Sequence, residues 1–437
     1  MDPIFLITTL IKMGVYFTVV LTFVAYAVYA ERRFSAVIQD RVGPNRTMIP
    51  SSILGFKDDI KLPLGGLTQP IADGLKFILK EDFTPGHVRK HFFWLAPCMT
   101  MVPSLITIAV IPFGSPIAIE GSENPISMAI ADINVGPLFI FAISSLAVYG
   151  ITIAGWASNS KFPFIGGVRA SAQMISYEIA LGLSIIPLLL LYGELNLGRI
   201  VQFQSEHGWL LLPFWGHTEE YGLTEKLVML IPMSLAFIIF TISIFAETNR
   251  TPFDLAECET ELVGGYHTEY SSMKFALFFL GEYAAMVIGS ALIVTLFLGG
   301  WSLPFGWDAK LLADGETGAF PIWVSTIVHM GCFLTKVVGF ILFFILVRWS
   351  IPRFRYDQLM KLGWVIFFEL ALINIILTAL IIARPAIGNG AFMISLGGLA
   401  VFSFLMFKLA KSIDSKVGPG KAIPATPVTE AEPTPAN

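Results

Sequence analysis

The chain has 437 residues, of which 55% are hydrophobic and only 14% are charged, and its mean hydropathy is +0.73. An ordinary soluble domain carries roughly a quarter charged residues, so this composition excludes a chain that covers itself with a water-facing surface. The net charge of −4 excludes the basic excess of a nucleic-acid binder. Cys98, Cys258 and Cys332 are far apart, which argues against a disulfide framework, a zinc site or an iron–sulfur site.

Nine apolar windows are long enough for membrane-spanning helices, which need about 20 residues each. In chain order they are Ile4–Ala30, Phe92–Phe113, Val135–Trp156, Ala170–Tyr192, Leu227–Ala246, Phe275–Leu298, Ile322–Val347, Leu362–Ala383 and Gly390–Phe407. The first window is too long for a signal peptide and lacks its basic start. We therefore expect an all-α, polytopic membrane protein with a single integral domain over residues 1–410. The Pro-rich tail, 411–437, is expected to be disordered.

The distribution of Lys and Arg predicts the orientation of the chain in the membrane. If the N-terminus is outside, the outside loops hold only Arg199, Lys226, Lys310 and Arg384. The segments 31–91 and 247–274 are then cytoplasmic loops, and the C-terminus is inside. In the first of these loops, Ile71, Leu75, Ile78 and Leu79 fall at helical spacing. This spacing predicts an amphipathic helix that lies on the membrane face, packs on neighbouring loops, or does both.

The second cytoplasmic loop is unusually acidic. The stretch AETNRTPFDLAECETELVGGYHTEY, residues 246–270, carries six carboxylates and one arginine, Arg250. The carboxylates are Glu247, Asp254, Glu257, Glu259, Glu261 and Glu269. Such a cluster would titrate as a coupled set that can hold protons near neutral pH. Its spacing fits no calcium loop, so we do not expect a metal site.

Ionisable residues inside predicted spans include Glu178, Glu282, Glu369 and Lys336. A charge at the bilayer centre costs roughly 2.5–3.5 kcal/mol on insertion scales, and such groups commonly mark an ion or proton path. The alternative is a buried ion pair or a neutral, hydrogen-bonded carboxyl. Lys336 is a candidate counter-charge for one of the glutamates.

Five motifs in the right order resemble the H-type membrane subunits of respiratory complex I, the NADH–quinone oxidoreductase. They are AERRFSAVIQDRVGPNR at 30–46, QPIADGLKFILKE at 69–81, GWASNSKFPFIGGVRASAQMISYE at 155–178, the acidic stretch at 246–270, and PRFRYDQLMKLGW at 352–364. The resemblance extends from the first span through the eighth. It implies an all-helical subunit of the inner (cytoplasmic) membrane of a bacterium, forming the membrane side of a ubiquinone or menaquinone chamber.

The resemblance also implies roles for individual residues. Those expected to line the quinone chamber or its mouth are Glu31, Arg32, Arg41, Asp73, Arg250 and Phe253. Those expected on the proton path are Glu178, Glu247, Glu257, Glu259, Glu261, Glu269 and Glu282, with Lys336 added from its place inside a span. No catalytic centre or cofactor is expected on this chain alone. Quinone would be the substrate, and flavin and iron–sulfur clusters would belong to partner subunits of the peripheral arm.

The sequence departs from the family pattern in places. The segment 47–68 is longer than usual, and Glu369 stands where many relatives have proline, so neither receives a role from the resemblance. Three alternatives remain at this point: the membrane subunit of an energy-converting hydrogenase, a stand-alone ion transporter and a structural anchor. The ERR…GPN region and the QP helix favour the quinone-chamber interpretation, and the lack of an evident inverted repeat argues against a transporter.

Overall fold

The computed structural model describes residues 3–47, 65–117, 126–209, 211, 223–257, 259–304, 322–387, 397–399 and 408. Contacts group Met1–Ile381 into one compact unit and Ile382–Asn437 into a second. The first unit contains every site discussed below. Within the described residues the chain is helical and contains no strand, so the predicted all-α class is confirmed.

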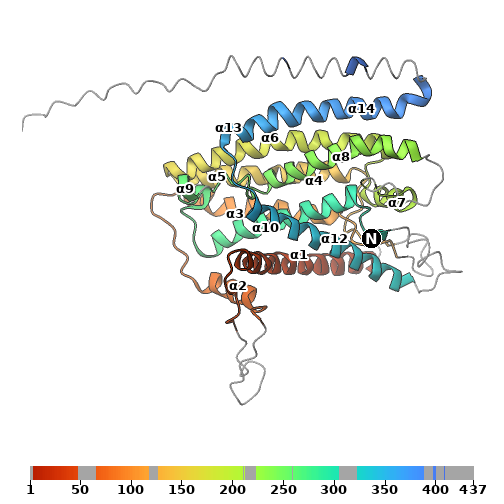
Figure 1. Ribbon diagram of the computed structural model, residues 1–437. Coiled ribbons are helices and arrows are strands. Elements are labelled where there is room, and N and C mark those ends of the chain that lie inside the picture. Colours follow the sequence, from red (N-terminus) through yellow and green to blue (C-terminus); the bar gives the residue numbers. More distant parts are fainter. Residues whose placement is uncertain are drawn as a thin grey trace, which may run out of the picture. The chain divides into compact units, whose positions relative to one another are not determined.

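The first helices in chain order are α1 (Pro3–Ile38), α2 (Gln69–Leu79), α3 (Lys90–Ile106), η2 (Thr107–Val110), α4 (Gly136–Ser144), α5 (Leu146–Ala157), α6 (Lys161–Tyr192) and α7 (Leu197–His207). They are followed by α8 (Leu223–Glu247), α9 (Glu259–Leu262), η4 (Gly265–His267), α10 (Ser272–Phe297), α12 (Ile322–Ser350), α13 (Tyr356–Lys361), the π-helix η6 (Leu362–Phe367) and α14 (Phe368–Ile387). Figure 1 shows this order from α1 in red to α12 in teal.

Eight helical segments of the described residues are long and apolar enough to cross a membrane. They are Ile7–Ile38, Lys90–Val110, Gly136–Ala157, Lys161–Tyr192, Val228–Glu247, Ser272–Phe297, Val324–Ser350 and Tyr356–Arg384. These match the first eight predicted spans and confirm a polytopic membrane protein. The ninth predicted span, Gly390–Phe407, lies outside the described residues except for 397–399, and the 47–68 segment and the tail lie outside them almost entirely.

Several helix ends differ from the hydropathy windows. The first helix continues to Ile38, and α6 begins at Lys161 rather than near Ala170. Hydropathy marks only the apolar part of a helix, whereas the backbone hydrogen bonds continue into polar residues. As a result Glu178 lies near the middle of α6 and not close to its start.

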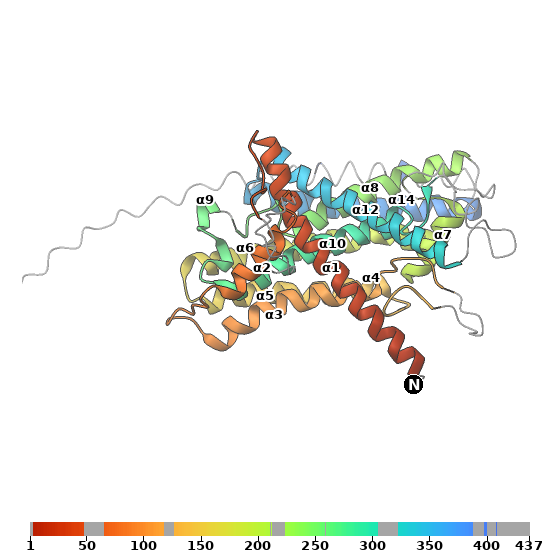
Figure 2. The ribbon, with the colours of Figure 1, turned by 90° about the horizontal axis from the view of Figure 1, so that it is seen from below.

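The helices of the first unit pack closely because small residues lie at their contacts. An ideal Cβ on Gly150 of α5 would approach the Thr100 hydroxyl of α3 to 2.3 Å. An ideal Cβ on Gly155 would lie 2.6 Å from the Pro163 carbonyl oxygen, at the start of α6. Such small-residue contacts let helix backbones approach in a membrane protein. The central helix α10 contacts α1, α3, α7, α8 and α12, and α1 crosses obliquely in Figure 2.

The amphipathic helix predicted in the first loop is α2. It has Pro70 at its start, as expected of a helix N-terminus, and it has no buried residue. Ile71, Leu75 and Leu79 are 62%, 53% and 82% exposed, so its apolar side is open in the isolated chain. Its C-terminal end is fixed to α10, where the Ser272 hydroxyl lies within hydrogen-bond distance of two carbonyl oxygens of that turn.

Candidate functional site

A buried arginine joins two buried carboxylates from different helices. Nη1 of Arg250 lies 3.1 Å from Oε2 of Glu31 in α1, and its Nε lies 2.6 Å from Oε1 of Glu282 in α10. The three side chains are only 7%, 10% and 12% exposed. Burial alone would lower the pKa of Arg250, but Glu282, Tyr283 and Glu31 outweigh it and raise that pKa, so the guanidinium stays charged.

Two residues that the sequence analysis did not select complete this network. Arg348, in the last turn of α12, forms a second ion pair with Glu31. The Tyr283 hydroxyl donates a 2.6 Å hydrogen bond to Oε2 of Glu31, and the Tyr283 ring lies 3.9 Å from the Arg250 guanidinium. A buried ion pair needs such additional hydrogen bonds to offset desolvation. Both residues have a sequence signal, because Tyr283 follows Glu282 and Arg348 ends a predicted span.

The acidic loop reaches the same network. Asp254 is buried and pairs with Arg353 at 3.0 Å, which ties the loop after α8 to the segment after α12. Burial raises the pKa of Glu257 well above its ordinary value, and Glu282 and Asp254 raise it further, while Arg250 and Arg348 act against the shift. These shifts favour the protonated form of Glu257, next to the Arg250 network.

A second carboxylate pair lies between α6 and α8. Glu178 of α6 is an electrostatic neighbour of Glu247, the last residue of α8, and the Ser144 hydroxyl is a hydrogen-bond partner of Glu247. Glu247 also lines a small cavity of about 40 Å³ together with Ser104, Thr107 and Thr248. This volume exceeds the roughly 10–15 Å³ that one water molecule needs, and the exposed lining of the cavity is mostly apolar.

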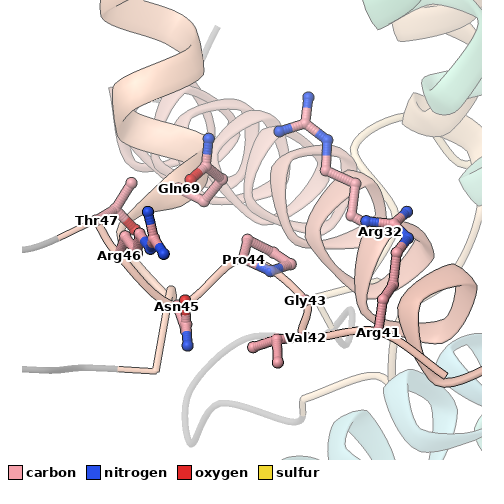
Figure 3. A pocket seen from close by; sticks show the side chains of 9 residues that line it. All are labelled: Arg32, Arg41, Val42, Gly43, Pro44, Asn45, Arg46, Thr47 and Gln69. Atoms are coloured by element: carbon pink, nitrogen blue, oxygen red, sulfur yellow. The ribbon is translucent and has the colours of Figure 1, made fainter.

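A third group lies where α1 ends. Nη1 of Arg32 pairs with Oδ2 of Asp73 in α2 at 2.6 Å, and the Gln69 amide donates a 3.0 Å hydrogen bond to the other carboxylate oxygen. Beside this pair is a pocket of about 850 Å³, lined by Arg32, Arg41, Val42, Gly43, Pro44, Asn45, Arg46, Thr47 and Gln69. In Figure 3, Arg32 and Arg41 lie on one side of it, and Arg46, Thr47 and Gln69 lie on the other.

The remaining predicted site residues lie elsewhere. Glu261 pairs with Arg169 at 2.8 Å and is 59% exposed, whereas Glu269 lies 3.9 Å from the exposed His87. Phe253 is buried against Tyr177 and Phe354, so it packs in the core. The side chain of Glu259 lies outside the described part of the chain.

Lys336 has a structural partner that the sequence did not suggest. Its ammonium donates to the carbonyl oxygens of Leu298, Gly300 and Ser302 at 2.8, 2.9 and 2.7 Å, just after the end of α10. These bonds use all three donors of the group, and a cation at a helix C-terminus is favourable. The structure therefore places Lys336 as a cap of α10, while Arg250 and Arg348 supply the counter-charges of the buried glutamates.

Gln173 of α6 holds the loop that carries Arg250. The side chain is fully buried, and its amide nitrogen lies 2.8 Å from the Ala246 carbonyl oxygen and 2.8 Å from that of Phe253. We expect Gln173→Ala to remove one hydrogen bond from each carbonyl, at about 0.5–1.5 kcal/mol for each bond, because both carbonyls keep a backbone donor. The thermal stability of the assembled protein should fall by several degrees, while Gln202→Ala, on exposed α7, should not change it. Equal melting temperatures for the two variants would contradict this role.

Comparison with known proteins agrees with this arrangement. A family model described as NADH dehydrogenase matches residues 11–379. An H-type subunit of the NADH-quinone oxidoreductase of Cytophaga hutchinsonii is 45% identical over 374 residues, covering 86% of this chain and 96% of that protein. The chain belongs to the NADH dehydrogenase family. Two other family members are H-type subunits. The one from Geobacter metallireducens is 44% identical over 85% of this chain and 96% of its own length. The one from Flavobacterium johnsoniae is 42% identical over 88% of this chain and 97% of its own length.

Family membership confirms the resemblance inferred from the five motifs. It supports the quinone-oxidoreductase interpretation over the hydrogenase and transporter alternatives. The matched range includes all three groups of charged residues, from Glu31 to Arg353.

Proposed function

We propose that this chain is the quinone-side membrane subunit of a proton-pumping NADH:quinone oxidoreductase. It would work only in the assembled complex, where peripheral-arm subunits carry the flavin and the iron–sulfur clusters and deliver electrons to quinone. In this proposal the chain lies in the inner membrane of a bacterium with its N-terminus outside and its C-terminus inside. The Arg32 pocket, the acidic loop and the peripheral arm are then on the cytoplasmic side.

One observation carries the proposal: consecutive residues of α1 serve two different environments. Arg32 lines the open pocket, and Glu31 belongs to the buried Arg250 network. Neighbouring residues of an α-helix point about 100° apart, so one turn of α1 joins a polar pocket to a buried charge relay. A change of charge in the pocket would therefore act electrostatically on Glu31, Arg250 and Glu282.

The chain's own residues would have separate tasks. Arginine and amide donors around the pocket suit the carbonyl oxygens of a quinone headgroup, which accept hydrogen bonds. Reduction of quinone by two electrons creates a demand for protons. The buried carboxyls near Arg250, and then Glu247 and Glu178, would respond by taking up or releasing protons. Moving one proton against 100 mV costs about 2.3 kcal/mol, and a shift of two pKa units is worth about 2.7 kcal/mol.

Asp73→Asn tests the quinone side of the proposal. The Arg32–Asp73 pair is partly exposed, at 47% and 22%, so its loss should cost little stability. We expect normal complex content but a several-fold higher KM for quinone, because Arg32 is no longer held at the pocket. The measurement is NADH oxidation at varied quinone concentration in membranes. Glu194→Gln removes a similarly exposed ion pair of α7 and serves as the control. An unchanged KM in Asp73→Asn would contradict a quinone site here.

A further inference from the structure

A close contact between two backbone segments brings His267 to Glu257. Gly265 of η4 has a φ of +62°, and an ideal Cβ there would lie 1.8 Å from the Ala256 carbonyl oxygen. On the other side, a Cβ on Gly166 of α6 would lie 2.8 Å from the backbone nitrogen of Tyr266. Only glycine permits such approaches. The η4 turn is therefore fixed between α6 and the segment that carries Glu257, and His267 is its last residue.

The two side chains face one another in a mostly enclosed space. Nδ1 of His267 lies 3.6 Å from Oε1 of Glu257, and the side chains are 13% and 21% exposed. This distance is several tenths of an ångström longer than the usual distance between donor and acceptor in a hydrogen bond. A small rotation of the glutamate side chain would bring the two atoms within that distance. The imidazole edge is held by Tyr266 and Phe275, whose ring centroids are each 5.1 Å away.

The surroundings of the pair favour its neutral form, with one exchangeable proton between the two groups. Burial lowers the pKa of His267 to about 4, so its ring is neutral. Burial raises the pKa of Glu257, which favours the protonated carboxyl. The charged and titratable groups that act on Glu257 are Asp254, Glu282, Arg250 and Arg348, and Tyr266 lies in the same electrostatic environment.

We propose that His267 is the proton-exchange partner of Glu257. In the exchange step the O–H bond of Glu257 breaks and an N–H bond forms at Nδ1 of His267. The neutral pair becomes a carboxylate–imidazolium pair, and the net charge of the site does not change. This inference rests on the proposed function, because it gives Glu257 a role in proton movement rather than in folding alone.

The surroundings explain why a histidine is useful at this position. Negative charge on Asp254 and Glu282 opposes ionisation of Glu257, while an imidazole next to the carboxyl can accept its proton. Arg250 and Arg348 act in the opposite sense. The direction of proton transfer therefore depends on the charge state of the Arg250 network, which is the part of the chain joined to the pocket through Glu31. A transfer step that is unfavourable at rest becomes accessible when that network loses negative charge, because its carboxylates oppose ionisation of Glu257.

Two substitutions separate proton exchange from packing and from hydrogen bonding. His267→Phe fills the aromatic site but accepts no proton, whereas His267→Asn keeps hydrogen-bonding atoms but does not titrate. We expect both variants to lower quinone-coupled NADH oxidation by about tenfold or more at every pH from 6 to 9. Complex content, measured with an artificial acceptor that takes electrons before quinone, should stay normal. His207→Asn is the matched control, since His207 stacks on Phe203 at 4.1 Å in α7, away from this pair.

A double variant provides the second readout. Groups that act in one step are non-additive, so adding Glu257→Gln to His267→Asn should cause no further loss. Three results would overturn the inference. They are normal turnover in either single variant, multiplied losses in the double variant, and failure of both single variants to assemble. If Glu247→Gln impairs turnover while the His267 variants do not, only this inference fails. If Glu247→Gln is also normal, the proposed function itself fails.

Discussion

Replacing Arg250 with glutamine should remove most of the assembled complex from the membrane. The substitution leaves Glu31 and Glu282 buried with no cation between them, although Arg348 still pairs with Glu31. Removing one partner of a buried ion pair typically costs about 3–5 kcal/mol, which is a large part of the stability of a domain. The measurement is complex content in membranes, by immunoblot or by native gel with activity staining.

Arg250→Lys makes the same test without removing the charge. One ammonium cannot reproduce the planar guanidinium, which reaches Glu31 through one nitrogen and Glu282 through another. We expect enough assembled complex for assay, and quinone-coupled turnover lowered by about tenfold or more. Arg199→Lys, at an exposed pair in α7, should have no effect. Normal turnover in Arg250→Lys would mean that the bridge is not needed for coupling.

Glu247→Gln should give the largest loss of activity without a loss of assembly. Glutamine has nearly the same shape and keeps a hydrogen bond to Ser144, but it takes up no proton. It also relieves the repulsion from Glu178, so the fold should tolerate it. We expect quinone-coupled NADH oxidation to fall by about tenfold or more in membranes with normal complex content. The control is Glu206→Gln on the exposed side of α7, and equal activities in the two variants would contradict the assignment.

Much of the fold follows from local sequence. Within the described residues, the first eight long apolar runs become helices, because a helix satisfies the backbone within a membrane. The spacing of Ile71, Leu75 and Leu79 also correctly predicts α2. The helix ends are less predictable, since α6 extends through polar residues from Lys161 that hydropathy does not mark.

The partners of the buried charges could not be predicted from local sequence. The sequence offers Lys336 as a counter-charge for a glutamate inside a span, but Glu282 pairs with Arg250. Glu31, just outside the first predicted span, pairs with Arg250 and Arg348, which are distant from it in sequence. Lys336 lies near the middle of a predicted span. Its ammonium donates hydrogen bonds to backbone carbonyl oxygens just after α10 and does not pair with Glu31 or Glu282. The sequence indicates that buried charges need partners, but which residues pair depends on how α1, α10 and α12 pack together.

The acidic stretch likewise divides in a way that composition does not reveal. It was predicted to titrate as one coupled set, but Glu247 lies with Glu178, and Glu257 lies with Asp254 and Glu282. Glu261 is 59% exposed and pairs with Arg169 of α6, so it lies apart from both groups. His267 gave no sequence signal beyond its place in GGYH, since its contact with Glu257 depends on Gly265 packing on Ala256.

The most direct test of the central claim measures the rates of quinone reduction and of proton translocation together, in sealed vesicles that contain the Glu247→Gln complex. Oxidation of a limiting amount of NADH is followed together with the change of pH in the vesicles. If the buried carboxylates couple the two processes, quinone reduction and proton translocation fall together, and the artificial-acceptor activity stays unchanged. Wild-type quinone reduction with wild-type proton translocation in this variant would contradict the account.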